Sequence, residues 1–318
     1  MPGTPSFWWR QNLSWKAYLL MPLGRLYVFL TWISRGFKKR QMLKAPSPVV
    51  SVGNLVMGGA GKTPVTLALA VFLKEKGFHP VGVSRGYGGD VKAPSSVDAT
   101  DDWRRVGDEA LLLAQEMPTF VSRQRSNALF LIPFQKKTVI LLDDGHQHES
   151  LHKDLSLIVM NDIQQHGNEQ VFPAGPLREP LAEGLRRAHA LVWIGSGPSP
   201  SLSIPILRAS LLPSVSLKKG ERVVAFAGLG YPDKFRRTLE DLGLEVVDFR
   251  GFPDHFPYRC KDLMALERIS REKDAPLVTT EKDFMRLPAA FQPKIFCVKI
   301  KVVWEDPQAV WDVIGQYL

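Results

Sequence analysis

In SVGNLVMGGAGKTPVTLALA, residues 51–70, a glycine-rich loop stands between an apolar strand and an apolar helix. Glycines at such a turn let backbone N–H groups converge on an anion, and the helix N-terminus adds about half a positive charge. The common phosphate-loop pattern is GxxxxGK[ST], but Val56 stands where that pattern has its first glycine. The stretch therefore indicates a nucleotide site with an unusual loop. A glycine-rich turn with an incidental lysine is the alternative.

The residues of this loop have distinct expected roles. Lys62 would reach the terminal phosphates, and Thr63 would contact a magnesium ion. Pro64 falls in the first helical turn, where its missing N–H costs nothing. The expected nucleotide-binding residues of the loop are Gly58, Gly59, Ala60, Gly61, Lys62, Thr63 and Pro64.

A second polar site follows an apolar strand in TVILLDDGHQH, which ends in Asp143 and Asp144. Carboxylates at the C-terminal end of a parallel strand are placed to hold Mg²⁺ opposite a phosphate loop. Zinc is the alternative ion, but no cysteine is nearby and the two acids already have a use. The histidines that would hold zinc are His146, His148 and His152.

Composition indicates a globular protein. The 318 residues, 45% of them hydrophobic, can bury a sizeable core and suggest roughly two domains. The two cysteines, Cys260 and Cys297, give no disulfide framework and no CxxC metal pair, which favours a reducing compartment.

Positive charge is concentrated at the N-terminus. The chain has 41 basic and 32 acidic residues, but residues 1–44 hold eight basic residues and no acid. The remainder therefore has 33 basic against 32 acidic residues and is nearly neutral, which argues against nucleic acid as a partner.

Residues 1–44 also hold four of the eight tryptophans, and residues 17–33 are largely apolar. Aromatic and basic residues together are typical of a lipid headgroup region. Pro22, Gly24 and Arg25 interrupt the run, which is shorter than the roughly 20 residues of a spanning helix. We therefore expect a helix that lies in the membrane surface. A full span and a helix packed on the protein's own core are the alternatives, and a cleaved signal peptide fits poorly.

The remaining chain alternates short apolar runs with helical patterns, which predicts parallel βαβ units. The expected strands are 48–53, 79–86, 138–144, 155–160 and 188–195, with helices at 63–77 and 108–117. A Pro/Ser/Gly-rich linker follows at 195–205, and the alternation then resumes with helices near 232–243 and 260–272. The predicted fold class is α/β, with a phosphate-loop kinase-like parallel sheet and a second, smaller α/β domain. The expected domains are the membrane-associated helix (1–44), the kinase domain (45–200) and the C-terminal domain (201–318).

Several motifs together resemble the tetraacyldisaccharide 4'-kinases of lipid A synthesis. They run in order from about residue 46 to 285: SVGNLxxGGxGKTP, VSRGYG, GDEA, DDGxQH, FPAGPLREP, AFAGLGYPDKF, FPDHFPY and TTEKD. One departure is His146, where the family more often has phenylalanine. The resemblance implies that a loop without the early glycine is normal for the family.

The resemblance also implies an activity. Such a kinase moves the γ-phosphate of MgATP to the 4'-hydroxyl of a tetraacylated glucosamine disaccharide 1-phosphate, at the cytoplasmic face of the inner membrane. Its expected cofactors are ATP and Mg²⁺, its partners are the lipid substrate and the membrane surface, and no protein partner is implied.

By similarity, Asp108 is the catalytic base and His255 tunes it, while Arg125 and Arg178 surround the transferring phosphate or the substrate's anionic group. Simpler roles stay open: a helix cap for Asp108, a loop histidine satisfied by Asp254 for His255, and structural ion pairs for the arginines. For Arg178 the ion-pair partner would be Glu179 or Glu183. The metal ligands are expected to be Thr63, Glu109, Asp143 and Asp144, and Gln147 and His148 are expected to complete the nucleotide site.

Two other functions remain as alternatives. A deviant-loop ATPase of the MinD type would cycle on membranes without a small-molecule acceptor, but it usually carries a lysine at the position of Met57. A basic module that docks on RNA or membrane without catalysis is opposed by the acidic Asp143/Asp144 pair and the near-neutral body.

Overall fold

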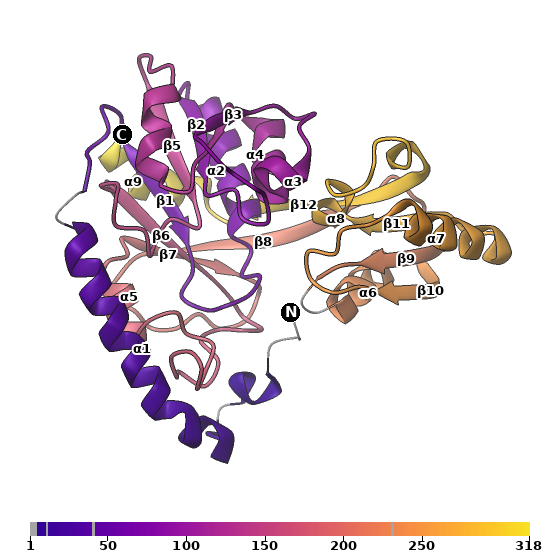
Figure 1. Cartoon of the computed structure of the whole chain (residues 1–318), viewed down its shortest axis with the longest axis horizontal. Helices are drawn as coiled ribbons and strands as arrows, with labels where there is room; N and C mark the ends of the chain where they lie inside the picture. Colours follow the sequence, from indigo (N-terminus) through magenta and orange to yellow (C-terminus); the bar gives the residue numbers. More distant parts are fainter. Residues whose placement is uncertain (1–4, 11, 40–41, 230–231) are drawn as a thin grey trace. The chain divides into compact units, whose positions relative to one another are not determined.

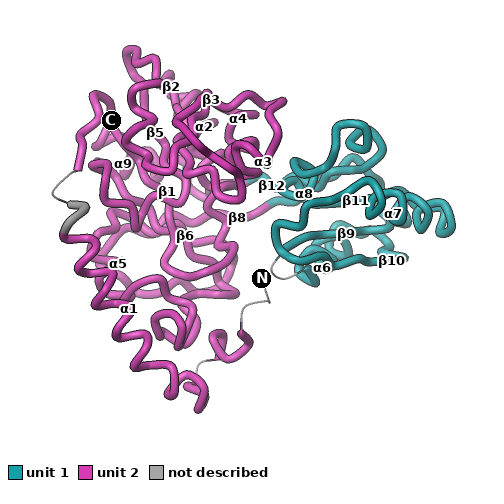
Figure 2. The backbone as a smooth tube through the Cα atoms, in the orientation of Figure 1, with its two compact units in different colours: residues 1–3, 212–301 teal, residues 4–211, 302–318 magenta. Residues whose placement is uncertain are grey.

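The computed structural model describes residues 5–10, 12–39, 42–229 and 232–318, which divide into two compact units (Figures 1 and 2). The large unit holds the described residues up to 211 together with residues 302–318, and the small unit holds residues 212–301. The chain passes from one unit to the other within strands β8 (Ile206–Ser214) and β12 (Ile295–Trp304).

The large unit is built on a mostly parallel sheet with the order β8-β7-β6-β1-β5-β2-β4-β3. The edge strand β3 pairs with β4 in the antiparallel sense. The strands besides β8 are β1 (Val49–Gly53), β2 (His79–Ser84), β3 (Ser95–Val97), β4 (Thr119–Val121), β5 (Thr138–Asp143), β6 (Leu155–Asn161) and β7 (Ala190–Ile194). Every residue of β1, β5, β6 and β7 is buried, as expected for parallel strands covered on both faces.

Helices surround this sheet (Figure 1). On one face of β1, Val50 and Val52 pack with Leu69 of α2, and on the other face Val49 packs with Ile140. The helical segments of this unit are η1 (Ser6–Trp9), α1 (Trp15–Lys39), α2 (Lys62–Glu75), α3 (Trp103–Val106), α4 (Asp108–Glu116), η2 (Arg125–Leu131), α5 (Leu181–Arg186), α9 (Pro307–Ile314) and η4 (Gly315–Tyr317).

The small unit has a parallel sheet with the order β10-β9-β11-β12. Its other strands are β9 (Arg222–Ala227), β10 (Glu245–Gly251) and β11 (Leu277–Thr280), and its helical segments are α6 (Pro232–Asp241), α7 (Cys260–Lys273), α8 (Glu281–Phe284) and η3 (Gln292–Lys294). Phe226, Tyr258 and Leu263 are fully buried in its core.

The N-terminal helix α1 is longer than the sequence predicted. It runs for 25 residues and continues through Pro22, Gly24 and Arg25, so the expectation that this segment is too short to span a membrane is wrong. Gly24 faces the body of the unit, because a Cβ there would lie 3.1 Å from the carbonyl oxygen of Val171. Within the described residues, Trp15–Gly36 is the one segment long and apolar enough to cross a membrane. The length of α1 is therefore compatible both with a helix that lies on the bilayer and with one that spans it.

The α/β class and the alternation of strands and helices are confirmed. The domain bounds at 44/45 and 200/201 stay a prediction, while the compact units change at 211/212 and at 301/302. Arg40 of the basic N-terminal segment, and Gly230 and Tyr231 of AFAGLGYPDKF, lie outside the described residues.

Candidate phosphoryl-transfer site

The glycine-rich loop follows β1 and opens α2, as the sequence predicts. Gly58 and Gly61 have φ angles of 109° and 93°, in the left-handed region that favours glycine. A Cβ at Gly61 would also lie 2.8 Å from Ile194 Cδ1. The loop backbone therefore needs glycine at these two positions, and the N–H groups at the start of α2 form an anion site.

Val56 has a structural reason to replace the usual glycine. It is buried and forms an antiparallel bridge with Leu177. On either side, Met57 N–H donates to the Pro176 carbonyl at 2.8 Å and Arg178 N–H donates to the Leu55 carbonyl at 2.8 Å. An extended pairing of this kind suits a β-branched residue, and it fixes the PLREP segment directly against the loop.

Lys62 Nζ lies 3.5 Å from Asp144 Oδ1 and 3.3 Å from Asn54 Oδ1. Asn54 is fully buried, and its Nδ2 donates to the Val56 carbonyl at 2.7 Å. One amide side chain thus positions both the loop backbone and the loop lysine. Asn54 was not singled out from the sequence, although a polar residue directly after a largely apolar strand was a usable signal.

Thr63 Oγ1 donates to Asp143 Oδ2 at 2.9 Å, which joins the loop to the end of β5. Thr66 Oγ1 contacts the other carboxylate oxygen at 3.2 Å. Burial and the nearby Glu109 carboxylate raise the pKa of Asp143 to about 6, against the opposing effect of Lys62. A bound cation would strongly stabilise the ionised form of this carboxylate, because it offsets the free-energy cost of ionising the group in a buried site.

Asp144 is paired with Arg178, whose Nη1 donates to both carboxylate oxygens at 2.8 and 3.0 Å. Burial opposes ionisation, but Lys62 and Arg178 outweigh it and hold the pKa of Asp144 below its usual value. The ion-pair partners suggested from sequence for Arg178, Glu179 and Glu183, are wrong.

Arg125 is buried, and its Nη2 donates to the carbonyl oxygens of Asp143 and Asp144 at 2.8 and 3.0 Å. Burial lowers the pKa of Arg125, and the two carboxylates oppose that effect. Because Asp144 has a left-handed φ of 53°, these two bonds hold a strained turn in place. A direct contact between Arg125 and phosphate stays a prediction.

The donor set fits a magnesium ion. Mg²⁺ in nucleotide sites takes one or two carboxylates, a loop hydroxyl and phosphate oxygens, and it keeps several waters. Thr63 supplies the loop hydroxyl and Asp143 supplies a carboxylate, and the two lie at hydrogen-bond distance from each other. Asp144, the next residue in the chain, is a second carboxylate. Within the described residues, no cluster of three or more His, Cys, Asp or Glu side chains could hold a metal by itself.

The histidines considered for zinc have separate partners. His146 is buried and bonds Ser156 Oγ at 2.8 Å through Nδ1 and the Gly184 carbonyl at 3.1 Å through Nε2. Burial and Arg187 lower its pKa to about 3, so the ring is neutral. His148 Nε2 lies 2.7 Å from Ser150 Oγ, and His152 Nε2 lies 3.6 Å from Asp154.

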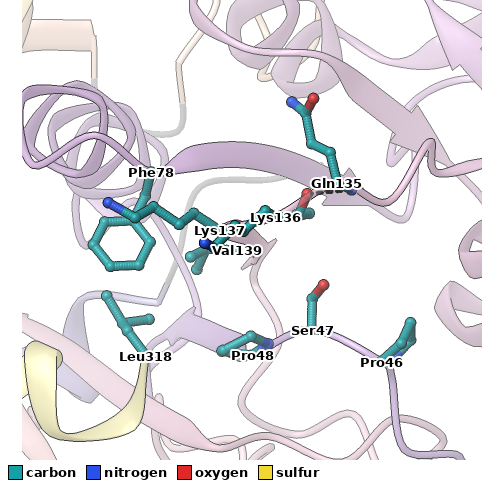
Figure 3. A pocket seen from close by; sticks show the side chains of 10 residues that line it. Pro46, Ser47, Pro48, Phe78, Gln135, Lys136, Lys137, Val139 and Leu318 are labelled. Atoms are coloured by element: carbon teal, nitrogen blue, oxygen red, sulfur yellow. Dashed lines mark hydrogen bonds between the residues drawn. The ribbon is translucent and has the colours of Figure 1, made fainter.

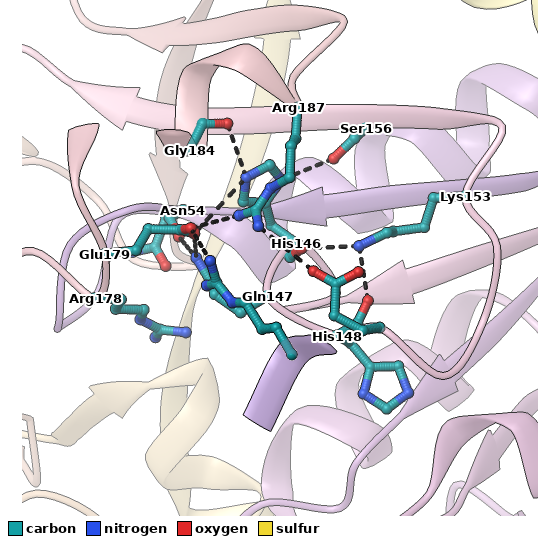
Figure 4. A network of polar contacts seen from close by, with 12 residues as sticks. Asn54, His146, Gln147, His148, Lys153, Ser156, Arg178, Glu179, Gly184 and Arg187 are labelled. Atoms are coloured by element: carbon teal, nitrogen blue, oxygen red, sulfur yellow. Dashed lines mark hydrogen bonds and ion pairs between the residues drawn. The ribbon is translucent and has the colours of Figure 1, made fainter. Parts of the chain in front are cut away.

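A buried carboxylate, Glu179, connects these elements, and Figure 4 shows its network. Gln147 Nε2 donates to Glu179 Oε1 at 3.0 Å and to the Asn54 carbonyl at 2.9 Å. Glu179 Oε2 accepts from Arg187 at 2.5 Å and from Arg35 of α1 at 2.7 Å. A chain of polar contacts therefore runs from the N-terminal helix to the loop. From the sequence, Glu179 was expected only as a possible ion-pair partner of Arg178.

Asp108 and Glu109 begin α4 in the large unit. The cap position is Gly107, and the buried Asp108 accepts the N–H of Glu109 at 2.8 Å, so the alternative that Asp108 is the cap residue is wrong. Glu109 is close enough to Asp143 to raise its pKa. His255 lies in the small unit, so its pairing with Asp108 stays a prediction.

Comparison with known proteins places this site in a family. The Tetraacyldisaccharide-1-P 4'-kinase family profile matches residues 16–318. The chain belongs to this family of kinases. The tetraacyldisaccharide 4'-kinase of Methylobacterium nodulans is 45% identical over 96% of this chain and 93% of its own length, and that of a Bradyrhizobium species is 41% identical over 99% and 95%. The crystal structure of LpxK from Aquifex aeolicus in complex with ATP aligns with a TM-score of 0.77 and 28% identity, covering 95% of this chain and 99% of that one.

For a kinase of this family, the structure gathers one group of expected residues at the carboxyl edge of the large sheet: the glycine loop with Lys62, Thr63, Asp143, Asp144 and Arg178. A pocket of about 400 Å³ lies elsewhere, at the amino ends of β1 and β5, and is lined by Ser47, Lys136 and Leu318 among others (Figure 3). It contains none of the expected site residues.

Proposed function

We propose that this chain transfers the γ-phosphate of ATP to the 4'-hydroxyl of a tetraacyldisaccharide 1-phosphate in lipid A biosynthesis. The observation that carries the proposal is the contact of Thr63 with Asp143 beside Lys62, in a chain that matches this kinase family over residues 16–318. Nothing in the comparisons supports the MinD-type ATPase.

The loop residues bind the nucleotide. Backbone N–H groups from Gly58 to Thr63 surround the phosphates, and the Lys62 ammonium meets the terminal phosphate in place of the Asp144 carboxylate. Magnesium, when bound, would be held by Thr63 and Asp143, with Asp144 and Glu109 nearby, and it neutralises charge on the phosphates. Gln147 supports the loop through Asn54, and His148 completes the surroundings of the nucleotide.

The acceptor needs a group that takes the proton of its 4'-hydroxyl. Asp108 fills this role in our proposal: it is a buried carboxylate at the start of α4, next to Glu109. Arg178 projects from the segment paired with the loop, where its guanidinium would bind phosphate oxygens in pairs.

The exposed side of α1 supports a lipid acceptor. Its large apolar side chains face away from the large unit, and several are more than half exposed: Trp15, Tyr18, Leu19, Leu23, Leu26, Phe29, Leu30 and Trp32. Apolar surface of this kind, next to basic residues, suits a bilayer surface. We propose that α1 holds the enzyme at the cytoplasmic face of the inner membrane, where it meets its substrate without a protein partner.

The direct test is incubation of the full-length protein with ATP, Mg²⁺ and a tetraacyldisaccharide 1-phosphate, followed by mass spectrometry. We expect one added phosphate at the 4' position, and its loss in Asp143→Ala. ATP hydrolysis that is independent of the acceptor, with no phosphorylated lipid, would contradict the proposal.

A further inference from the structure

A buried polar cluster in the small unit joins two motifs, FPDHFPY and TTEKD. Asp283 and Arg286 are fully buried and form an ion pair at 3.2 Å. Asp283 Oδ1 also accepts from Tyr258 Oη and from Gly228 N–H, each at 3.0 Å, and Oδ2 accepts from Thr280 Oγ1 at 2.6 Å. A carboxylate with this many donors holds its arginine in one position.

Arg286 in turn holds His255. Its Nη1 donates to the Gly228 carbonyl at 3.3 Å and to Asp283, and its Nη2 lies 3.2 Å from Nδ1 of His255. A guanidinium carries only donors, so Nδ1 of the imidazole must be the acceptor in this contact. The proton of the neutral ring is therefore on Nε2.

A protonated imidazole does not fit this arrangement. It would turn an Nδ1–H toward the Arg286 N–H, so that two donors would face each other with no acceptor between them. The carboxylate beside the ring is on the other side, since Asp254 Oδ1 lies 3.9 Å from Nε2. Among the described groups, His255 thus has a cation at Nδ1 and an acid near Nε2.

We propose that Arg286 is a positioning residue that holds His255 as the neutral Nε2–H tautomer. His255 then offers a hydrogen-bond donor from Nε2 and has no lone pair there to take a proton. Resting on the proposed kinase function, this makes His255 a donor to a carboxylate or phosphate oxygen and leaves the removal of the hydroxyl proton to a carboxylate. It also gives TTEKD a role, since Thr280 and Asp283 of that motif orient Arg286.

The test is the tautomer of His255, read from long-range ¹H–¹⁵N correlations of the imidazole rings in the full-length protein labelled with ¹⁵N-histidine. The His255 signals are assigned by their loss in His255→Gln. We expect the Nε2–H form in the unsubstituted protein. In Arg286→Met, which lacks a donor, we expect a mixture of tautomers or a protonated ring, and in Arg286→Lys a partial return of the Nε2–H form.

A matched control separates the contact from the network around it. Tyr258→Phe removes one bond to Asp283 without touching His255, so the tautomer should not change. Arg286→Met leaves Asp283 as an unpaired buried charge and could prevent folding. In that case the double variant Asp283→Asn/Arg286→Met, which removes both charges, replaces the single variant in the test. It should show the same loss of the Nε2–H form.

Kinase assays provide the second readout. Loss of a partner that orients a histidine typically costs roughly 10- to 100-fold in metal sites, and we expect a fall of that order in kcat for Arg286→Met with an unchanged KM for ATP. The proposal is overturned if His255 carries its proton on Nδ1, or if Arg286→Met leaves the tautomer unchanged. Because the tautomer is read without turnover, a failure of the proposed kinase function would be recognised separately.

Discussion

Lys62 is the residue whose charge the site depends on most directly. Its ammonium is held between Asn54 and Asp144 and faces the loop rather than the core. We expect Lys62→Ala to lower turnover by roughly 10²- to 10³-fold, the usual effect of losing one electrostatic donor to a transition state. Because Asp144 keeps its pairing with Arg178, the midpoint of thermal unfolding should change little.

The matched control is Lys76→Ala, which removes a lysine at the other end of the same helix. It should retain full kinase activity. Near-normal turnover in Lys62→Ala would contradict the phosphate-loop assignment.

Asp108 can be tested with a substitution that preserves shape. In Asp108→Asn the amide oxygen can still accept the N–H of Glu109, so the start of α4 is retained, but the side chain no longer takes a proton. We expect kcat to fall by about 10²-fold or more, with the KM for ATP nearly unchanged. If Asp108→Asn keeps normal turnover while Asp108→Ala lowers stability, the residue is structural.

The sequence predicted which residues surround the site but not which of them touch. Glycine, lysine and acid positions follow from motifs, since strand ends and helix starts fix their place. Contacts across long separations do not: Arg178 pairs with Asp144 and not with its neighbours in the chain. The roles of Asn54 and Glu179 were not predicted for the same reason, because Lys62 and Arg35, with which they pair, lie on other elements.

Among the elements, α1 is tied to the rest of the large unit by an ion pair between the half-buried Arg35 and the buried Glu179. Glu179 receives Arg35 from α1 and Arg187 from the end of α5. Burial alone would raise the pKa of Glu179, but the two arginines outweigh burial and lower it. Its stabilising effect is therefore present above its pKa in the unfolded chain, about 4.3, and is lost as the pH falls below that value.

We predict a pH-dependent stability gap between the unsubstituted protein and Glu179→Gln. At pH 7 the variant leaves the half-buried guanidinium groups of Arg35 and Arg187 without their carboxylate, and the loss of such charged hydrogen bonds typically costs about 1.5–3 kcal/mol in the free energy of unfolding. In denaturant titrations the gap should shrink as the pH is lowered below about 4.3, the pKa of a glutamate in the unfolded chain. Glu183→Gln, on α5 close by, should show no such gap, and a gap for Glu179→Gln that stays constant with pH would contradict the assignment.

Element prediction was best where the pattern was local. The strands and helices that were expected between 48 and 195 lie close to their expected bounds, because buried parallel strands and the helices packed on them leave clear apolar runs. The short elements β3, β4, α3 and α5 were not predicted. Helix α1 is longer than the apolar run of the sequence, because it continues through Pro22, its eighth residue, although a proline inside a helix removes one backbone hydrogen bond. The long strands β8 and β12 were not foreseen, because their sequences mix exposed and buried residues.

At the scale of the whole molecule, the division into units could not be predicted from the linker. The Pro/Ser/Gly-rich stretch lies inside the large unit, and the chain changes unit in the middle of β8 and β12. After β12 the chain returns to the large unit, where Val310 and Ile314 of α9 join the core beside Phe72 and Leu73. This return of the chain depends on packing between segments that are distant in the sequence, and amino-acid composition does not predict such packing.

The recruitment of the whole enzyme to a bilayer is predicted to depend on the exposed face of α1. Leu19, Leu26 and Leu30 are each more than half exposed, so changing all three to glutamine should preserve the fold and ATP binding. Each leucine buried in lipid contributes roughly 1.5–3 kcal/mol, so partition to anionic vesicles should fall on the order of 10²-fold or more. Activity on acceptor in bilayers should fall with it, while activity on acceptor dispersed in detergent should be retained.

The matched control for that triple variant changes three exposed apolar residues elsewhere, Phe130, Ile163 and Met264, to glutamine. It should bind vesicles normally, because these side chains lie outside α1. Added salt should weaken the attachment of the unsubstituted protein only in part, since screening acts on the basic residues and spares the buried apolar surface. Unchanged vesicle binding in the leucine variant, or equal losses in both variants, would show that α1 is not the membrane-binding element.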